Sequence, residues 1–197
     1  MIRDPLSLLR DKQGATAVEF ALIAPTLLMA IMGILDLGYN MYATSMLQGA
    51  IQKAARDSTL EGGGGNSAVL NARVADAVHD VVPGATMSYS RTAYTSFSDV
   101  GRPEDYSDLN GDGSCNNGEP FEDVNGNASW DADRGTAGQG GARDAVLYKV
   151  TVSYPRAFPV AGLIGLPSNF TTVAQTVLRN QPYNFQQINP PTTGNCL

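Results

Sequence analysis

The sequence predicts an α+β protein: a long N-terminal transmembrane and stalk helix, a second helix, and a small antiparallel sheet that carries a loop-rich insert. Three observations predict it. An uncharged apolar run lies near the N-terminus, apolar residues then recur at helical spacing, and three later stretches alternate as strands do. At 197 residues, the chain is long enough for one domain with a modest core and an anchor.

The membrane anchor is predicted by the uncharged run Phe20–Leu35. Sixteen helical residues span about 24 Å, which is less than the roughly 30 Å of a hydrocarbon core, so the span must include flanking residues. Three basic residues lie on its N-terminal side: Arg3, Arg10 and Lys12. On its C-terminal side the first basic residue is Lys53. This asymmetry predicts a single-pass protein with a cytoplasmic N-terminus and an exported remainder.

The helix is expected to continue beyond the membrane to about Leu60, because apolar residues keep recurring every three or four positions until the run Gly62–Gly65. A second amphipathic helix is predicted over 67–82, ended by Pro83 and Gly84. Strand-like alternation follows in three segments: 86–91, 145–154 and 170–178. The chain therefore divides into 15–60, 61–98, an insert at 99–144, and a C-terminal part at 145–197.

The insert holds most of the acid. Between Asp99 and Asp144 there are eleven acidic and three basic residues, whereas the whole chain has a net charge of −6. The absence of a basic stripe argues against a nucleic-acid partner. An acidic block beside a nearly neutral remainder favours an insert that binds cations.

Residues 108–119 fit the twelve-position calcium loop, in which a tight turn brings alternate oxygen ligands to one centre. The predicted ligands are Asp108, Asn110, Asp112, the Ser114 carbonyl, Asn116 and a bidentate Glu119, with Gly113 at the sharp turn. Pro120 follows at once and disfavours a continuing helix. The loop is thus EF-hand-like without the usual helix pair.

A weaker copy begins four residues later. Its predicted ligands are Asp123, Asn125, Asn127, Asp131 and Asp133. It lacks glycine at position six and has Arg134 at position twelve, so Asp131 or Asp133 would have to complete the shell. The competing interpretation of both loops is a solvated turn, since Asn, Asp and Gly favour turns without a metal. We expect calcium as the cofactor and leave one or two ions open.

The two cysteines, Cys115 and Cys196, are too few for a disulfide scaffold. In an exported domain they can form one bridge between the insert and the C-terminal tail. Two unrelated free thiols are the alternative.

A charged residue, Glu19, stands at the mouth of the apolar run, where burial of a carboxylate is costly. An acid there can complement the helix dipole. The segment from Gly14 to Phe20 also resembles the processing site of Flp-type prepilins and TadE-like pseudopilins. That resemblance implies a leader at 1–14, cleavage by a prepilin peptidase between Gly14 and Ala15, and pairing of Glu19 with a neighbouring subunit's N-terminal amine.

An ordinary secretory signal peptide is the alternative for this region, but Met41 stands where its cleavage site needs a small residue. Segments within 145–183 also resemble TadE-like proteins, although Gln181 stands where relatives often have an acid. The apolar loop 158–167 is open to two interpretations: a turn packed on the sheet, or a contact with lipid or a neighbouring subunit.

The resemblance implies a pilin-like fold and a non-enzymatic minor pilin or pseudopilin that helps assemble a tight-adherence (Flp) pilus. Its implied partners are other pilins, the tight-adherence secretion machinery, the prepilin peptidase and the bacterial inner membrane, with the C-terminal domain periplasmic or extracellular. A membrane-anchored calcium-dependent surface adhesin is the alternative. A hydrolase is disfavoured because the chain has one histidine and no nucleophile-elbow motif.

Overall fold

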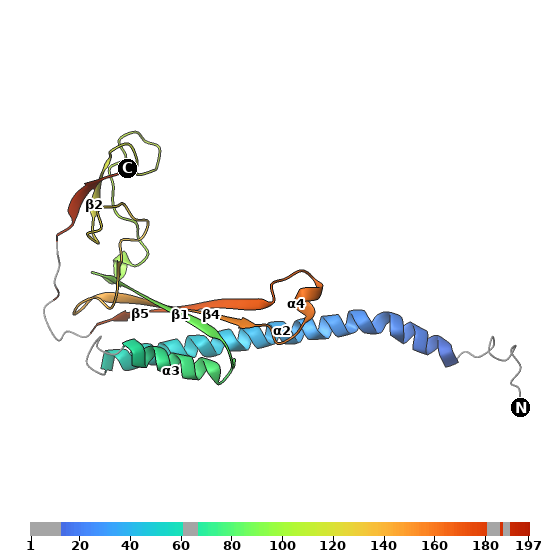
Figure 1. Ribbon diagram of the computed structural model, residues 1–197. Helices are drawn as coiled ribbons and strands as arrows, with labels where there is room; N and C mark the ends of the chain where they lie inside the picture. Colours follow the sequence, from blue (N-terminus) through green and yellow to red (C-terminus); the bar gives the residue numbers. More distant parts are fainter. Residues whose placement is uncertain (1–12, 61–66, 181–185, 187–189) are drawn as a thin grey trace, which may run out of the picture. The chain divides into compact units, whose positions relative to one another are not determined.

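The computed structural model describes residues 13–60, 67–180, 186 and 190–197 (Figure 1). Its helices are α2 (Gln13–Leu60), α3 (Ser67–His79) and α4 (Val160–Leu163), with a 3-10 turn η1 (Phe97–Asp99). Its strands are β1 (Thr86–Tyr94), β2 (Pro120–Asp123), β3 (Thr136–Ala137), β4 (Ala145–Pro155), β5 (Asn169–Arg179) and β6 (Thr192–Asn195). The α+β class and the long first helix are confirmed. Residues 1–12 of the predicted leader lie outside the described residues.

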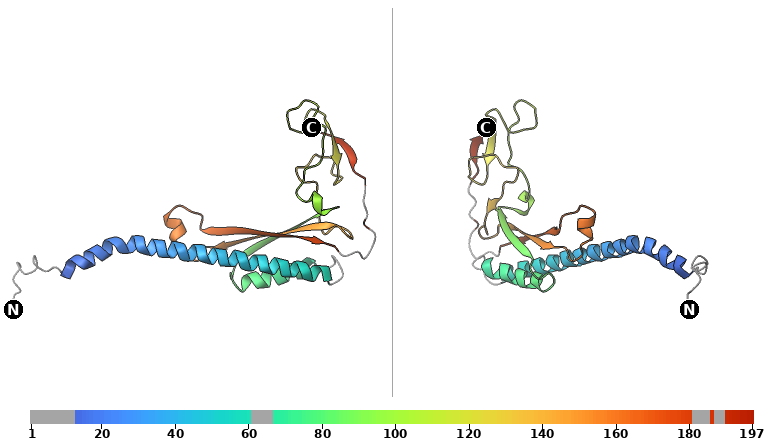
Figure 2. Two further views of the ribbon diagram at one scale, coloured as in Figure 1. Left: turned by 180° about the vertical axis from the view of Figure 1, so that it is seen from behind. Right: turned by 45° about the vertical axis from the view of Figure 1, so that its right-hand side comes forward.

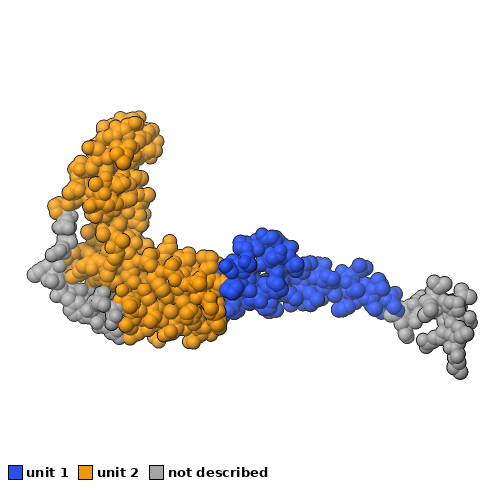
Figure 3. Space-filling model, viewed as in Figure 1, with its two compact units in different colours: residues 1–42, 155–170 blue, residues 43–154, 171–197 orange. Residues whose placement is uncertain are grey.

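The chain divides into two compact units, which Figure 3 shows in different colours. Unit 1 comprises 1–42 and 155–170, and unit 2 comprises 43–154 and 171–197. Helix α2 and the strands β4 and β5 each contribute residues to both units.

The core of unit 2 lies between the sheet and the helices α2 and α3 (Figures 1 and 2). The sheet has the order β3-β1-β4-β5, and β1 pairs antiparallel with β4 from Thr86↔Ser153 to Tyr94↔Ala145. Strand β4 alternates as predicted, because side chains on one face of a pleated strand share one environment. The buried apolar side chains include Leu47, Ile51, Val74, Val78, Val146, Val150 and Val152.

A polar cluster centred on Asn71 joins α3 to the sheet. Its side-chain oxygen accepts hydrogen bonds from Arg91 (2.7 Å) and from the Tyr148 hydroxyl (2.9 Å). The Arg91 guanidinium lies 4.4 Å from the centre of the Tyr148 ring. Burial raises the pKa of the Tyr148 phenol to about 12, and the positive charge of Arg91 opposes that shift. The phenol is therefore a neutral hydrogen-bond donor over the whole physiological range.

Helix α3 ends at His79, three residues before the predicted end. Beyond it the backbone forms a turn in which the Val82 N–H donates to the Val78 carbonyl, and the His79 ring lies 3.1 Å from the Ala85 carbonyl. Gly84 supplies a left-handed φ of 83°, which glycine adopts at little steric cost. This turn leads the chain directly into β1.

The second, two-stranded sheet was not predicted. Strand β2 of the insert pairs antiparallel with β6 of the C-terminal tail, from Pro120↔Asn195 to Asp123↔Thr192. The ring of Phe121 is buried beneath β6, and a Cβ at Gly194 would collide with it. The last residues of the chain thus complete the insert.

Unit 1 is built on the N-terminal part of α2, whose apolar side chains are largely exposed: Val18, Phe20, Leu22, Ile23, Leu27, Leu28, Ile31, Ile34 and Leu35. Among the described residues this is the one helix long and apolar enough to cross a membrane. Asp36 is buried instead, and it forms an ion pair with Arg156 and accepts a hydrogen bond from Asn40 (3.1 Å).

Candidate functional site

The first acidic loop, 108–119, is held by hydrogen bonds from its own backbone to its first carboxylate. Asp108 accepts from the backbone N–H groups of Gly111 (2.6 Å), Asp112 (3.2 Å) and Gly113 (2.9 Å). Gly111 and Gly113 both have φ near 77°, a conformation that favours glycine. In the same loop the Asn110 side-chain oxygen accepts from the Asp112 N–H (2.8 Å), and the Asp112 carboxylate accepts from the Ser114 N–H (2.8 Å).

The second loop, 123–134, repeats this arrangement position by position. Asp123 accepts from the N–H groups of Gly126 (2.7 Å), Asn127 (3.1 Å) and Ala128 (2.8 Å). Two further bonds match those of the first loop: Asn125 accepts from the Asn127 N–H (3.1 Å), and Asn127 accepts from the Ser129 N–H (2.8 Å). Ala128 takes a φ of 62° at the position where the first loop has Gly113. The missing glycine therefore does not prevent the turn.

Each loop is closed by a buried glutamate, but the two glutamates come from different directions. In the first loop Glu119 accepts from the N–H groups at positions two, three and nine, which belong to Leu109 (2.7 Å), Asn110 (3.2 Å) and Asn116 (3.3 Å). In the second loop the N–H groups at positions two and nine belong to Val124 (2.8 Å) and Asp131 (3.1 Å), and both donate to Glu104. Glu104 thus occupies the place that Glu119 has in the first loop.

Sequence reasoning missed Glu104 because it precedes both loops, 20 residues before its partner Val124. The sequence contains one indirect indication: Arg134, rather than an acid, stands at position twelve of the second loop, so an acid that closes this loop has to come from another part of the chain. Arg134 instead donates to the Pro103 carbonyl and pairs with Asp105 at 2.9 Å.

Asp131 and Asp133, the two acids predicted to complete the ligand set of the second loop, have different surroundings. Asp131 lies within the loop, where it accepts from the side-chain amides of Asn125 (2.7 Å) and Asn127 (2.6 Å). Asp133 makes neither of these contacts, and its carboxylate accepts from the Tyr94 hydroxyl (2.9 Å). Burial and the hydrogen bond to Asp133 raise the pKa of the Tyr94 phenol to about 12.

Three carboxylates of the insert are almost completely buried: Glu104 is 1% exposed, Glu119 2% and Asp123 4%. None of the ion pairs formed among the described residues includes them. Burial raises the pKa of Asp123, but the N–H groups of Ala128, Gly126 and Asn127 outweigh that effect and lower it overall. Backbone N–H groups, rather than Lys or Arg side chains, therefore hold these three carboxylates.

The ligand atoms that the two loops offer are oxygens, the type that calcium prefers. Both loops offer carboxylate, amide and backbone oxygens, in the calcium-loop order through position twelve in the first loop and up to position nine in the second. The side chains are turned toward the backbone, however, and no three Asp, Glu, His or Cys side chains of the described residues converge as a metal cluster. The hydrogen bond from the Asn116 amide, then that from Ser114 N–H, lowers the pKa of Asp112, so that acid is ionised at neutral pH.

A disulfide joins Cys115 of the first loop to Cys196 in the C-terminal tail, 81 residues away in sequence. Two backbone hydrogen bonds accompany it: Gly118 N–H donates to the Cys196 carbonyl (3.0 Å), and Cys196 N–H donates to the Glu119 carbonyl (2.8 Å). The first loop and the tail are thus tied together covalently beside the closing glutamate.

Replacing both cysteines with serine is expected to lower the free energy of unfolding of the insert by about 3–5 kcal/mol, because the bridge restricts the unfolded chain over a long loop. Urea unfolding followed by the emission of Trp130, at fixed calcium, measures the loss. Reduction of the wild-type protein should reproduce the shift and should leave the double variant unchanged. Equal midpoints for the oxidised wild type and the variant would rule out a stabilising role.

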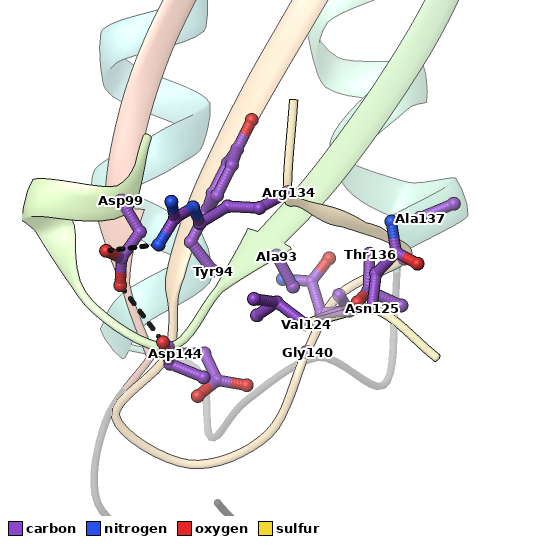
Figure 4. Close-up of a pocket in the computed structure, with 13 residues that line it drawn as sticks. Ala93, Tyr94, Asp99, Val124, Asn125, Arg134, Thr136, Ala137, Gly140 and Asp144 are labelled. Carbon is purple, nitrogen blue, oxygen red and sulfur yellow. Dashed lines mark hydrogen bonds and ion pairs between the residues drawn. The ribbon is translucent and has the colours of Figure 1, made fainter. Parts of the chain in front are cut away.

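A pocket of about 340 Å³ lies where β1 and the loop after β3 meet the second acidic loop (Figure 4). Its charged lining residues are Asp99, Arg134 and Asp144. Arg134 lies 3.9 Å from Asp99, which also accepts a hydrogen bond from Thr95 (3.0 Å). These contacts link the segment that follows β1 to the end of the second acidic loop.

The residues of the predicted processing site lie in the first turns of α2. Gly14, Ala15, Glu19 and Phe20 are all exposed, and a Cβ at Gly14 would meet no atom within 4 Å. The two residues that flank the predicted cleavage point are therefore exposed, and nothing in the described fold requires glycine at position 14.

Comparison with known proteins places this helix in a family context. Residues 14–56 match the family model described as TadE-like protein. Neither the curated proteins nor the solved structures contain a match to the chain. The matched segment coincides with the helix able to cross a membrane. Residues 14–56 are thus similar to TadE-like proteins, over a segment shorter than half of the chain.

Proposed function

We propose that this protein is a non-enzymatic minor pilin or pseudopilin that takes part in the assembly of a tight-adherence (Flp) pilus. The observation that carries the proposal is the match of residues 14–56 to TadE-like proteins on a long, exposed, apolar helix. Such a helix packs against lipid before assembly and against the helices of other subunits afterwards, because both surroundings are apolar.

In this proposal the prepilin peptidase cleaves after Gly14 at the inner membrane, and the helix remains part of the mature protein. Basic residues before the span keep the N-terminus in the cytoplasm and the C-terminal domain outside. Glu19 then becomes the fifth residue of the mature chain. Its exposed carboxylate pairs with the N-terminal amine of a neighbouring subunit, which removes two charges that lipid would penalise.

The function is tested by deleting the gene in its own host and counting surface pili by electron microscopy. We expect few or no pili, and restoration by the full-length protein. The matched control is the exported domain from residue 43 onward, fused to a cleavable secretory signal, which should restore none. If pili are normal in the deletion strain while calcium-dependent adhesion is lost, the protein is an anchored adhesin and the pilus proposal fails.

We also propose that the exported domain binds calcium at both acidic loops. The position-by-position agreement of the two loops supports it. So do the three buried carboxylates that form no ion pair within the described part of the chain, because buried negative charge is costly without a cation. The ligands of the first loop are Asp108, Asn110, Asp112, the Ser114 carbonyl, Asn116 and Glu119. Those of the second are Asp123, Asn125, Asn127, Asp131 and Glu104.

Calcium would neutralise these carboxylates and hold the insert in one conformation. Both loops adjoin β2, which begins after Glu119 and ends at Asp123, and β2 pairs with the tail strand β6. Ordering of the loops therefore fixes the tail as well. Calcium concentrations outside the cell are high enough for such a structural role at modest affinity.

A further inference from the structure

We propose that the apolar loop 158–167 of unit 1 inserts into the head-group and acyl-chain boundary of the phospholipid bilayer, as a second membrane contact beside the spanning helix. The loop runs from Phe158 to Pro167 and contains α4, which Pro159 directly precedes. This contact is separate from pilus assembly, and it rests on the membrane anchor alone.

The loop divides its apolar side chains between two surroundings. Val160 and Ala161 of α4 are buried. Leu163 is 71% exposed and Ile164 63%, and Leu166 is exposed as well. A short loop with a packed base and an apolar tip is the arrangement that lets side chains enter a bilayer while the backbone stays satisfied, and here Leu166 N–H donates to the Ala161 carbonyl (2.8 Å).

Contacts of Arg156 fix the base of this loop to α2. The Arg156 N–H donates to the Ser168 carbonyl (2.9 Å) and its Nε to the Pro167 carbonyl (3.2 Å), which closes the loop. Its guanidinium forms the ion pair with Asp36 of α2 and lies 5.2 Å from the centre of the Phe170 ring. The loop and the helix belong to the same compact unit, and both views in Figure 2 show α4 beside α2.

The level of this ion pair along α2 places the loop at the membrane surface. The uncharged run ends at Leu35, so Asp36 is the first charged residue after it. Because that run is several ångströms shorter than a hydrocarbon core, Asp36 and Arg156 lie near the outer boundary of the apolar layer. A loop attached there has lipid within reach.

The composition of the loop indicates what it contacts. From Ala157 to Phe170 the chain has no charged residue, so it offers nothing for a charged partner or for a particular lipid head group. The apolar side chains at its tip are exposed, as are those of Ile31, Ile34 and Leu35 on α2 of the same compact unit. Phospholipid is therefore the occupant, whatever the charge of its head group.

The test uses the oxidised full-length protein, in which Cys115 and Cys196 are already bridged, so that an introduced cysteine is the one free thiol. Leu163→Cys and Ile164→Cys are labelled separately with a nitroxide in phosphatidylcholine bilayers. Accessibility to oxygen, which partitions into lipid, is compared with accessibility to a neutral water-soluble nickel chelate. The matched control is Phe97→Cys on η1 in unit 2, with 67% exposure.

We expect oxygen to be favoured over nickel at both loop positions and nickel over oxygen at position 97. The measurement is repeated in lipid discs that hold one copy of the protein, where the loop signals should persist. Preference for nickel at positions 163 and 164 would overturn the proposal by placing the loop in water. Loss of the oxygen preference in single-copy discs would overturn it by showing that a second copy covers the loop.

Discussion

Glu104→Gln and Glu119→Gln are each expected to weaken calcium binding at their own loop by about 10- to 100-fold, the range for loss of a group that fixes or completes a metal site. Each glutamate is buried and accepts N–H groups from positions two and nine of its loop. The amide keeps the shape but removes the charge. Isothermal titration should therefore show one intact and one weakened site in each variant.

The weaker calcium binding of these variants should also lower their free energy of unfolding in the presence of calcium. At saturating calcium, a 10- to 100-fold weaker site removes about 1.4–2.8 kcal/mol of calcium-dependent stabilisation. Trp130 reports on it, since its indole N–H donates to the Glu104 carbonyl (2.9 Å) and its ring meets Tyr106 edge-on. Glu122→Gln is the matched control, because Glu122 is an exposed acid between the two loops. If Glu104→Gln and Glu119→Gln both bind calcium as the wild type does, the calcium assignment is contradicted.

Gly14→Val is expected to abolish processing, so that the protein keeps its leader and no pilus assembles. The physical reason is that the peptidase must accommodate the chain at the residue before the scissile bond, and valine adds a branched side chain there. Since a Cβ at Gly14 would meet no atom within 4 Å, the substitution leaves the fold intact. Electrophoretic mobility of the membrane-extracted protein and a count of surface pili measure both effects.

Gly49→Val serves as the control for this experiment. Gly49 lies on the same helix, is exposed, and also has open space where a Cβ would stand. It should be processed normally. If Gly14→Val yields the same mature product and the same number of pili as Gly49→Val, the processing site lies elsewhere and the role of the leader is lost.

The parts of this protein that the sequence predicts are those encoded locally. Helix α2 follows from an apolar run and from spacing within one segment, and β4 from alternation over consecutive residues. The first acidic loop is likewise contiguous, from Asp108 to Glu119. Each of these patterns is complete within about 50 residues or fewer, so no distant contact is needed to recognise it.

What the sequence could not show depends on distant partners. Glu104 closes a loop that begins 19 residues after it, and no spacing rule points backward along the chain. Strand β6 is a polar tetrapeptide without alternation, and it is a strand because β2 and the Cys115–Cys196 bridge hold it. Asp36 lies 120 residues from Arg156, so the sequence alone did not reveal their pairing.

The intact mass of the protein extracted from the membrane of its own host tests the central claim most directly. We predict a mature chain that begins at Ala15 and keeps the whole of α2 from that residue onward, found in the membrane fraction. A soluble product trimmed beyond residue 40 would contradict the account, because the helix that is proposed to join other subunits would be gone.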